Sequence, residues 1–507
     1  MARHVAYNRL MACDPIGRVA DVRAIERAAA DAPLMERAGL AAAGAARDEL
    51  AGRAPRVLIL AGPGNNGGDA LVVARWLKRW FFDVSVAFHG DAAKLSADAA
   101  AAHAAWRNAG GTLGSDWPEG GEFGLIIDGL FGIGLTRPVG GVAAQWIERA
   151  NECRARILAL DIPSGLNADT GLAYQPTIRA QGTATFIALK PGLLTADGPD
   201  HCGLIGVHAL GLDAAAGAPG RRLDWPSLAA KLPQPLRRAV RNVHKGSFGT
   251  LGIVGGNDGM IGAALLAARA ALNLGAGKIW VGLAASEPPA VDFSHPELML
   301  RRAEDVLDAE PTALAVGPGL GTDARARTLL ARALQRPLSL VLDADALNLI
   351  AADGELARLV AARTHATALT PHPAEAARLL ATATAAVQDD RLGAAVELAR
   401  KLRAGVVLKG AGSVLAFADG AWAINSSGNP GLASGGTGDV LSGMLGALLC
   451  QGIALREALE FSVCLHGAAA DALVAAGVGP LGLAASELAP AARRLVNAAA
   501  ATAAAME

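Results

Sequence analysis

A glycine-dense segment in the last third of the chain carries residue types suited to phosphoryl transfer. Residues 429–439 read Asn-Pro-Gly-Leu-Ala-Ser-Gly-Gly-Thr-Gly-Asp, and a helical apolar pattern follows at once. Glycines let the backbone approach an anion and direct successive N–H groups at it, and the following helix adds its positive end. Asp439 then stands where it can accept the proton of an attacking hydroxyl. The alternative is an ordinary helix start with Asp439 near the N-cap.

Further polar residues of the C-terminal half follow predicted strands. His372 lies between two prolines in Thr-Pro-His-Pro, a rigid loop that favours a ligand contact over a purely structural role. Residues 408–413 read Leu-Lys-Gly-Ala-Gly-Ser, and this strand end, cation and tight turn predict a contact with a nucleotide phosphate. The alternative for Lys409 is a solvated charge at the end of a strand. Asp343 and Asp345 follow a third strand.

The N-terminal half contains a second glycine-rich loop after an apolar run. Residues 62–69 read Gly-Pro-Gly-Asn-Asn-Gly-Gly-Asp and include the G-x-G-x-x-G spacing of dinucleotide-binding folds. Pro63 removes one N–H from the loop, and the acidic residue that such folds need after the second strand is poorly matched by Phe-His-Gly-Asp at residues 88–91. A redox dehydrogenase remains an alternative, but the two asparagines favour a polar binding loop.

Oxygen-bearing side chains of this half follow predicted strands and should meet at one rim. Hard oxygen donors of low total charge suit a monovalent cation or a wet polar pocket. Lys190, in Ala-Leu-Lys-Pro-Gly, is a candidate charge partner for Asp161, and such a pair can move a proton. The alternative for Asp161 is a cap on the turn before Pro163. The residues expected at the rim are Asn66, Asp128, Asp161 and Ser164.

The elements that position these residues alternate between strand-like and helix-like segments over the first half of the chain. Short apolar runs that end in Gly or Asp predict buried parallel strands, and residues 69–80 have a helical pattern. Ligands of such a sheet bind beyond the carboxyl ends of its strands. The predicted strands are residues 56–61, 84–88, 125–128, 157–161 and 185–189.

A change of composition separates this half from the next. The composition changes over residues 213–238. Residues 213–220 predict a linker, prolines follow at 226, 233 and 235, and we expect a domain boundary between residues 215 and 235. A second strand–helix rhythm follows, and residues 414–424 predict a hairpin that turns at Asp419-Gly420. The other predicted strands of this half are residues 250–256, 278–283, 313–316, 339–343, 367–370 and 405–409.

Composition and charge limit the class of protein. The 507 residues are 52% hydrophobic and 18% charged, which suits two or three domains with large cores. Because 46 Lys and Arg balance 47 Asp and Glu, a protein that coats nucleic acid is not expected. Five scattered cysteines, no signal-like N-terminal segment and no apolar run long enough for a membrane helix predict a reduced, cytoplasmic enzyme.

Together these motifs resemble one family, the bifunctional NAD(P)H-hydrate repair enzymes, over nearly the whole chain and in the family's order. The first half resembles the NAD(P)HX epimerase domain through Leu-Met-Glu-Arg-Ala-Gly at residues 34–39, the 62–69 loop, the loop after Asp128 and Asp-Ile-Pro-Ser-Gly at residues 161–165. The second half resembles the ADP-dependent NAD(P)HX dehydratase. Its matching segments are residues 244–249, 255–263, 317–321, 370–375, 409–413 and 429–439.

The resemblance implies an α/β protein in which a Rossmann-like three-layer epimerase domain, residues 1–220, precedes a ribokinase-like dehydratase domain, residues 221–507. By motif, the hydrated nucleotide would bind in the first domain to Asn65, Asn66, Gly67, Gly68, Asp69, Gly132, Ile133, Gly134, Leu135, Thr136, Arg137, Pro138 and Asp161. The S hydrate would bind in the second to Ala263, Gly319, His372 and Asp439. The adenine nucleotide would contact Lys409, Gly410, Ala411, Gly412, Ser413 and Gly438, and K⁺ would bind Asn66, Asp128 and Ser164.

The implied chemistry is the repair of reduced nicotinamide cofactors that have gained water across a ring double bond. The epimerase domain would interconvert the R and S hydrates, with Asp161 and Lys190 moving a proton. The dehydratase domain would use ADP and Mg²⁺ to phosphorylate the S hydrate, with Asp439 as base, and would release AMP and phosphate. Three positions depart from the family's pattern without removing a reacting group, namely Asn167, Ala374 and Ser434.

The partners expected from this resemblance are NADHX, NADPHX and ADP, with neither nucleic acid nor membrane, and the chain is expected to form a homo-oligomer. The nearest rival function is a vitamin or sugar kinase of the ribokinase type, which shares the glycine loop and Asp439 but gives no role to the first half. A catalytically silent binding module in the first half is another alternative.

Overall fold

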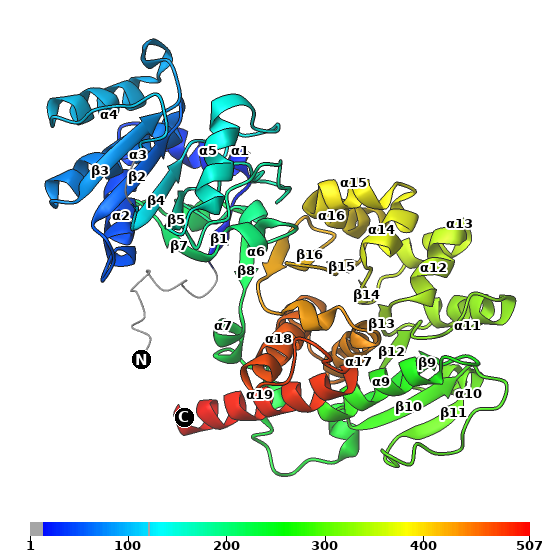
Figure 1. Ribbon diagram of the computed structural model, residues 1–507. Helices are drawn as coiled ribbons and strands as arrows, with labels where there is room; N and C mark the ends of the chain where they lie inside the picture. Colours follow the sequence, from blue (N-terminus) through cyan, green and yellow to red (C-terminus); the bar gives the residue numbers. More distant parts are fainter. Residues whose placement is uncertain (1–13, 120–121, 507) are drawn as a thin grey trace. The chain divides into compact units, whose positions relative to one another are not determined.

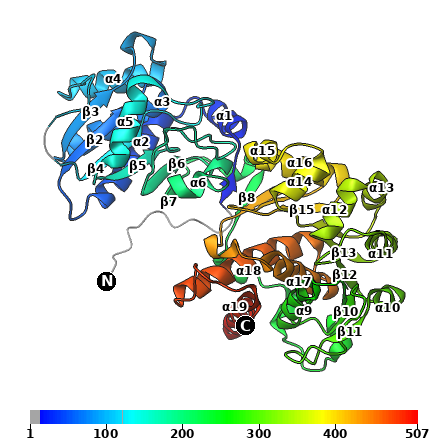
Figure 2. The ribbon, with the colours of Figure 1, turned by 45° about the vertical axis from the view of Figure 1, so that its right-hand side comes forward.

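The computed structural model describes residues 14–119 and 122–506 and divides the chain into two compact units, residues 1–221 and 222–507 (Figure 1). The division falls inside a short strand, β8 (Gly220–Leu223). Each unit is built around a sheet with helices packed against it (Figures 1 and 2). Residues 1–13 lie outside the described residues. They include Cys13 and the N-terminal segment in which the sequence shows no signal-like pattern.

The sheet of the first unit is parallel throughout and has the strand order β3-β2-β4-β5-β6-β7. Its strands are β2 (Arg56–Ala61), β3 (Asp83–Phe88), β4 (Leu125–Gly129), β5 (Arg156–Leu160), β6 (Gly182–Phe186) and β7 (Leu204–His208). Its helices are α1 (Val19–Ala28), α2 (Leu34–Glu49), α3 (Asn65–Arg79), α4 (Ala97–Asn108), α5 (Gly141–Glu152) and α6 (Gly198–His201).

Helices cover both faces of this sheet, which explains why its strands read as continuous apolar runs. In β2, Val57 and Ile59 belong to one buried cluster with residues of α2, α3 and α4. Leu58 and Leu60 point the other way and pack with α5. The first unit is therefore a three-layer α/β structure, and its strands end on one side in loops that carry the polar residues of the first site.

The second unit has a mixed sheet in the order β17-β16-β15-β14-β13-β12-β9-β10-β11, parallel except that β16 runs antiparallel to both of its neighbours. Its strands are β9 (Thr250–Gly255), β10 (Lys278–Leu283), β11 (Met299–Arg302), β12 (Ala313–Val316), β13 (Ser339–Leu342), β14 (Thr367–Leu369), β15 (Gly405–Leu408), β16 (Val414–Ala416) and β17 (Trp422–Asn425).

Two groups of helices sandwich this second sheet. The helices α9, α17, α18 and α19 share one large apolar cluster with alternate strand residues such as Leu251 and Ile253, and α10, α11 and α16 also pack against its strands. The helices of this unit are α7 (Trp225–Ala229), α8 (Gln234–Arg237), α9 (Ile261–Asn273), α10 (Ala303–Asp308), α11 (Ala324–Leu334), α12 (Asp345–Ala352), α13 (Gly354–Ala361), α14 (Pro373–Leu380), α15 (Thr384–Asp389), α16 (Arg391–Leu402), α17 (Thr437–Cys450), α18 (Leu455–Ala475) and α19 (Ala485–Met506).

Most predicted strands are confirmed to within two residues, and the predicted hairpin is confirmed as β16 and β17. The strand predicted at residues 185–189 is wrong by three residues, because Ile187 has a φ of 68° and β6 ends before it. The linker predicted at residues 213–220 holds a short 3-10 helix, Ala214–Ala216, and ends at the first residue of β8. The segment that follows, up to residue 238, holds α7 and α8, and β8 pairs with β1 (Pro15–Ile16).

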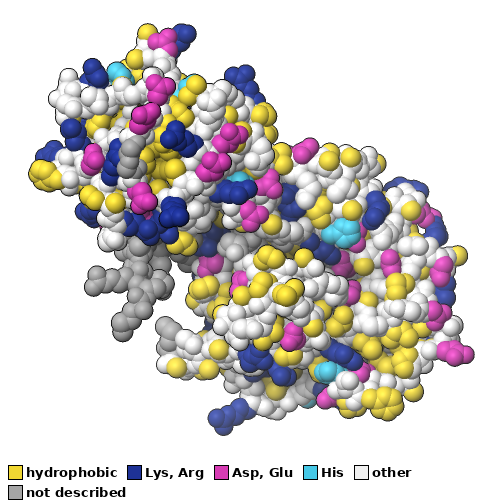
Figure 3. All heavy atoms as spheres, viewed as in Figure 1, with side chains coloured by type: hydrophobic (Ala, Val, Ile, Leu, Met, Phe, Trp, Pro, Cys, Tyr) yellow, Lys and Arg dark blue, Asp and Glu magenta, His cyan; other side chains and the backbone are white. Residues whose placement is uncertain are grey.

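Side chains of both charge signs are interspersed on the face of the protein that Figure 3 shows. Among the described helices, α18 is the one long and apolar enough to cross a membrane, and most of it is buried inside the second unit. The four described cysteines are free thiols, and Cys202, Cys450 and Cys464 are buried.

Candidate active sites

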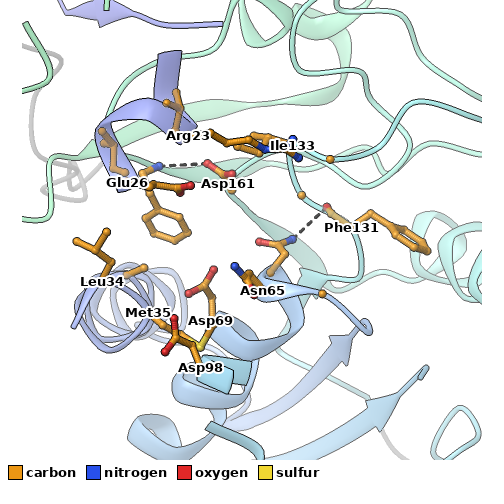
Figure 4. A pocket seen from close by; sticks show the side chains of 18 of the residues that line it. Arg23, Glu26, Leu34, Met35, Asn65, Asp69, Asp98, Phe131, Ile133 and Asp161 are labelled. Carbon is orange, nitrogen blue, oxygen red and sulfur yellow. Dashed lines mark hydrogen bonds between the residues drawn. The ribbon is translucent and has the colours of Figure 1, made fainter. Parts of the chain in front are cut away.

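A cavity of about 900 Å³ lies at the carboxyl ends of the strands of the first unit (Figure 4). Its walls come from α1, from the first turns of α2 and α3, from the loop after β4 and from the segments after β5 and β6. The predicted residues on this wall are Asn65, Asn66, Asp69, residues 132–137, Asp161 and Lys190. Gly67, Gly68 and Pro138 are not part of it.

The predicted polar loop at residues 65–69 is in fact the first turn of α3, which begins at Asn65 after the N-cap residue Gly64. A side chain on Gly67 would collide with the backbone of Gly62, and a Cβ on Gly68 would lie 2.7 Å from the sulfur of Met35. These two glycines therefore let α3 pack closely against its neighbours. Their contact with a substrate stays a prediction.

Lys190 and Asp161 form a buried ion pair on the cavity wall. The Lys190 side chain is fully buried, and its ammonium also donates to Thr185 Oγ1 at 2.9 Å and to the carbonyl of Phe186 at 2.8 Å. Asp161 follows β5 with a φ of 62°, a conformation that costs energy for a residue with a side chain and that aims its carboxylate at Lys190. The carboxylate does not cap the turn at Pro163, so that alternative is excluded.

Asp128 is joined to Ser164 by hydrogen bonds, and Ser164 and Asn66 both reach the carbonyl of Phe131. Asp128 is fully buried and accepts hydrogen bonds from Ser164 Oγ at 2.6 Å and from the Ser164 N–H at 2.7 Å. Asn66 donates to the carbonyl of Phe131 at 3.0 Å, but its buried Oδ1 has no hydrogen-bond partner among the described residues. A buried oxygen without a hydrogen-bond partner is a place where a cation would fit. Burial raises the pKa of Asp128 to about 6, against the hydrogen bonds from Ser164.

The second site gathers around Lys409, which follows β15. Its ammonium lies 2.9 Å from Oδ1 of Asp343, and Oδ2 of Asp343 accepts a hydrogen bond of 2.6 Å from Ser442 on α17. Burial disfavours the charge of Lys409, but Asp343, Glu375 and Asp439 outweigh burial and keep the pKa of Lys409 above its usual value. Lys409 is therefore not a solvated charge at a strand end, and that alternative is wrong.

Asp439 stands in the first turn of α17, next to this ion pair. A Cβ placed on Gly438 would lie 3.2 Å from Nζ of Lys409 and 3.8 Å from Oδ2 of Asp343, so the turn that carries Asp439 touches the pair directly. Burial, and then the negative charge of Asp343, raise the pKa of Asp439 to about 6, while Lys409 opposes the rise. Near neutral pH the Asp439 carboxyl is mostly ionised and can act as a base.

The glycine-rich loop before α17 is held from behind by α18. Asp471 accepts hydrogen bonds from the Gly428 N–H at 2.8 Å and from Asn429 Nδ2 at 2.9 Å. Nε2 of His466 lies 2.9 Å from the carbonyl oxygen of Thr437, and burial lowers the pKa of His466 to about 4. Gly436, the N-cap of α17, has a φ of 88° that favours glycine. The loop is thus fixed with its N–H groups at the start of a helix, a typical anion site.

Other predicted residues of this site come from neighbouring loops. Gly410 lies in a turn closed by Ser413, whose hydroxyl donates to the Gly410 carbonyl at 3.1 Å, and this turn directly follows Lys409. A Cβ on Gly319, which has a φ of 61°, would lie 3.2 Å from the Cβ of Ala263. Gly319 and Ala263 are therefore neighbours. The described residues contain no group of three His, Cys, Asp or Glu side chains that could hold a metal ion.

His372 has a structural role that its position between two prolines did not reveal. It caps α14, because its Nδ1 accepts from the N–H of Ala374 at 3.1 Å and of Glu375 at 3.4 Å, while Glu375 accepts the His372 N–H at 2.8 Å. Burial, followed by Lys409 and Arg378, lowers the pKa of His372. About half of the His372 side chain is exposed, so a ligand contact stays a prediction.

Comparisons with known proteins place this chain in a family. Residues 31–192 match the family described as YjeF-related protein N-terminus, and residues 251–492 match the family described as NAD(P)H-hydrate dehydratase. The bifunctional NAD(P)H-hydrate repair enzyme Nnr of Escherichia coli is 39% identical over 94% of this chain and 93% of its own length. The chain belongs to the family of bifunctional NAD(P)H-hydrate repair enzymes.

Other relatives agree with this family. The repair enzyme Nnr of Coxiella burnetii is 37% identical over 94% of this chain and 98% of its own length. Among solved structures, the ADP/ATP-dependent NAD(P)H-hydrate dehydratase of Bacillus subtilis, co-crystallized with ATP and Mg²⁺, is 31% identical. It covers 55% of this chain and 99% of its own chain, with a TM-score of 0.48. The fold class is confirmed as α/β, with a Rossmann-like three-layer first domain and a ribokinase-like second domain.

Several residues of this repair enzyme's sites were missed in the sequence. Arg23 and Glu26 of α1 line the first cavity, although no motif covers residues 19–28 (Figure 4). Their spacing of three residues puts them on one helix face, which is the signal that could have found them. Ser442 and Asp471 were missed because each acts through a partner distant in the sequence.

Proposed function

We propose that this chain repairs hydrated NADH and NADPH with one activity in each unit. The first unit epimerises the R and S hydrates, and the second dehydrates the S hydrate with ADP and releases NAD(P)H, AMP and phosphate. The observation that carries this proposal is a buried Lys–Asp pair beyond the strand ends of each unit, Lys190–Asp161 and Lys409–Asp343. Relatives named bifunctional NAD(P)H-hydrate repair enzymes, similar over nine-tenths of the chain, support it.

The chemistry of the hydrate explains what the first cavity must do. Water adds across an enamine double bond of the dihydropyridine, so the hydroxyl stands on a carbon bonded to the ring nitrogen. Epimerisation requires the bond to that hydroxyl to break and re-form on the other face, with a proton delivered and a proton removed. Asp161, held by Lys190 at the cavity wall, is placed to take the proton of the returning water.

The K⁺ ion that the family resemblance implies would be held by Asn66, Asp128 and Ser164. The buried, unsatisfied Oδ1 of Asn66 supports this assignment. When bound, K⁺ supplies a positive charge that neutralises the buried carboxylate of Asp128. The residues themselves order the wall, because Ser164 Oγ accepts the Phe131 N–H at 2.9 Å and so fixes the loop that leads into residues 132–137.

The second unit is arranged for transfer of a phosphoryl group from ADP to the hydroxyl of the S hydrate. Asp439 accepts the hydroxyl proton, and the N–H groups at the start of α17 receive the phosphoryl oxygens. Lys409, followed by the turn at residues 410–413, contacts the nucleotide phosphates. Mg²⁺, when bound with the nucleotide, neutralises phosphate charge. The transfer leaves AMP, and loss of phosphate together with a ring proton then restores the double bond.

A cytoplasmic location and a homo-oligomeric state are also proposed. Buried free thiols at Cys202, Cys450 and Cys464 support a reducing compartment. Light scattering from the purified protein tests the oligomeric state, and a monomer mass would contradict it.

The experiment that tests the function supplies each hydrate separately and separates the products by chromatography. Purified R hydrate without ADP should yield the S hydrate, and purified S hydrate with ADP should yield NAD(P)H and AMP in equal amounts. Vitamin phosphorylation with ATP and no action on either hydrate would support the kinase alternative. Dehydration without epimerisation would leave the first unit as a binding module, and hydride transfer would support the redox dehydrogenase.

A further inference from the structure

Asp69 differs from Asp128 and Asp161 of the first site because no side chain among the described residues pairs with it. It stands in the first turn of α3 and lines the cavity. Asp161 is bonded to Lys190, and Asp128 is bonded to Ser164, but no hydrogen bond or ion pair reaches the Asp69 carboxyl from the residues that the structure describes. A carboxyl left without a partner in a partly enclosed cavity is placed to meet a ligand rather than to hold the fold.

The position of Asp69 opposes that of Asp161 across the cavity. Figure 4 shows the Asp69 side chain extending from α3 into the space that Asp161 faces from the other wall. The apolar side chains of Leu34 and Met35 lie on the α2 side of Asp69 in the same view. A substrate ring between the two walls would therefore meet one carboxyl on each face.

The charged groups around Asp69 favour its neutral form. Burial, and then the negative charges of Asp161 and Glu26, raise the pKa of Asp69 well above its usual range. Lys190 acts in the opposite direction, and Asp98 adds a further negative charge. The cationic groups that line the cavity besides Lys190 are Arg23, Arg27 and Arg137. A carboxyl that favours its neutral form, across a cavity from a carboxylate ion-paired with a lysine, is a usual arrangement for an acid and a base.

We propose that Asp69 is the general acid of the epimerisation, with Asp161 as the base on the opposite face, an assignment that rests on the epimerase function proposed for the first unit. The protonated Asp69 gives its proton to the hydroxyl of the hydrate, the C–O bond breaks and water leaves. The lone pair of the ring nitrogen forms a C=N bond. Water adds to the same carbon from the other face, loses a proton to Asp161 and leaves the inverted hydroxyl.

The atoms balance in this sequence, because one water leaves and one water adds. Asp69 ends as a carboxylate and Asp161 as a carboxylic acid, so the reverse epimerisation begins with the roles exchanged, or solvent returns the proton. Glu26 is the less suitable acid. Although burial also raises the pKa of Glu26, the cationic residues Arg23 and Arg27 of its own helix favour its ionised form.

The test is Asp69→Asn, which keeps the shape of the side chain but removes its proton. Epimerisation of the R hydrate should fall by about 100-fold or more in kcat with little change in KM. Dehydration of purified S hydrate with ADP should not change. Asp69→Glu should restore part of the rate, and Asp200→Asn, which removes an exposed carboxyl away from the cavity, should leave both activities intact.

A second readout is independent of turnover. In the infrared spectrum near neutral pH, the C=O band of protonated carboxyls should be weaker in Asp69→Asn than in the wild type, while the contribution of Glu375 remains in both. The wild-type epimerisation rate should also fall as alkaline pH ionises Asp69. A wild type that does not epimerise would refute the proposed function itself. If the wild type epimerises the hydrate, and a folded Asp69→Asn protein keeps the wild-type kcat and an unchanged infrared band, only the role of Asp69 would be refuted.

Discussion

Lys409 and Asp343 are joined by an ion pair in which Nζ lies 2.9 Å from Oδ1, although 66 positions separate them in the sequence. The pair connects the segments after β13 and β15, and Ser442 on α17 donates to the other oxygen of Asp343 at 2.6 Å. Asp343 thereby fixes the cation, the strand ends and the helix that carries Asp439 relative to one another. This makes Asp343 a positioning residue of the dehydratase site.

Asp343→Asn should therefore damage both stability and dehydration. The substitution removes the ion-pair partner of the largely buried Lys409 and leaves only the more distant charges of Glu375 and Asp439, which costs about 3 kcal/mol in the free energy of unfolding of the second unit. Denaturant unfolding measures that loss, and assays of both activities should show dehydration lost with epimerisation kept. Asp389→Asn, on the exposed surface of α15, is the matched control and should change neither quantity. An Asp343→Asn protein with wild-type stability would contradict the positioning role.

The dehydratase rate should depend on the ionisation of Asp439. Because the pKa of Asp439 is raised to about 6, the base form is present above that pH and is lost below it. We expect kcat/KM of the dehydration to be flat above about pH 7 and to fall about tenfold per unit of pH below about pH 6. Asp439→Asn should lower the rate by about 100-fold or more and leave epimerisation unchanged. A wild-type rate that stays constant down to pH 4 would exclude Asp439 as the base.

Glu375 should make the second unit less stable as the pH rises. Burial raises the pKa of Glu375 in the folded state to about 7 from 4.5, so stability declines from about pH 4.5 and reaches its lower limit above about pH 7. Glu375→Gln can still accept the His372 N–H but carries no charge. At pH 8 the variant should be more stable than the wild type by up to about 3 kcal/mol, and at pH 5 the two should be nearly equal. A difference that does not change with pH would contradict this explanation.

Asn66 provides the test of the cation site. Asn66→Ala removes the unsatisfied Oδ1, so the stabilisation of the first unit by K⁺ should weaken or disappear. Thermal unfolding in KCl and in NaCl at equal ionic strength measures the effect. The wild type should show a higher Tm in KCl, and the variant should show the same Tm in both salts. Equal Tm values for the wild type in the two salts would argue against a K⁺ site.

Most strands of both sheets were predictable because they are short apolar runs, many of them closed by Gly or Asp. The edge strands β7 and β11 were not predicted, because they are less buried and less apolar. The apolar pattern reflects burial on both faces, and it located β2, β9 and β12 almost to the residue. It also located the polar residues, since side chains after parallel strands meet at one edge of the sheet. Asp161 and Lys190 were correctly paired on this basis.

Contacts between distant segments were not predictable from local patterns. Asp343 was visible at a strand end, but its partners Lys409 and Ser442 depend on the packing of α17 against the sheet. The role of His372 as a helix cap was missed because Pro373 and Glu375 were taken for loop residues instead of the first turn of α14. The spacing of Arg23 and Glu26 puts them on one face of α1, but the sequence does not show that this face lines the cavity.

The most direct test of the two-site function is the recovery of reduced-nicotinamide absorbance from a mixed sample of R and S hydrates, with K⁺ and Mg²⁺ and with or without ADP. The wild type should recover all of the absorbance in one fast phase, and only with ADP. With Asp161→Asn, the recovery of absorbance should stop at about the fraction of the sample that is S hydrate. With Asp439→Asn, no absorbance should be recovered, although the R hydrate is still converted to the S hydrate. Fast and complete recovery by Asp161→Asn, or none by the wild type, would contradict the division of the reaction between the two units.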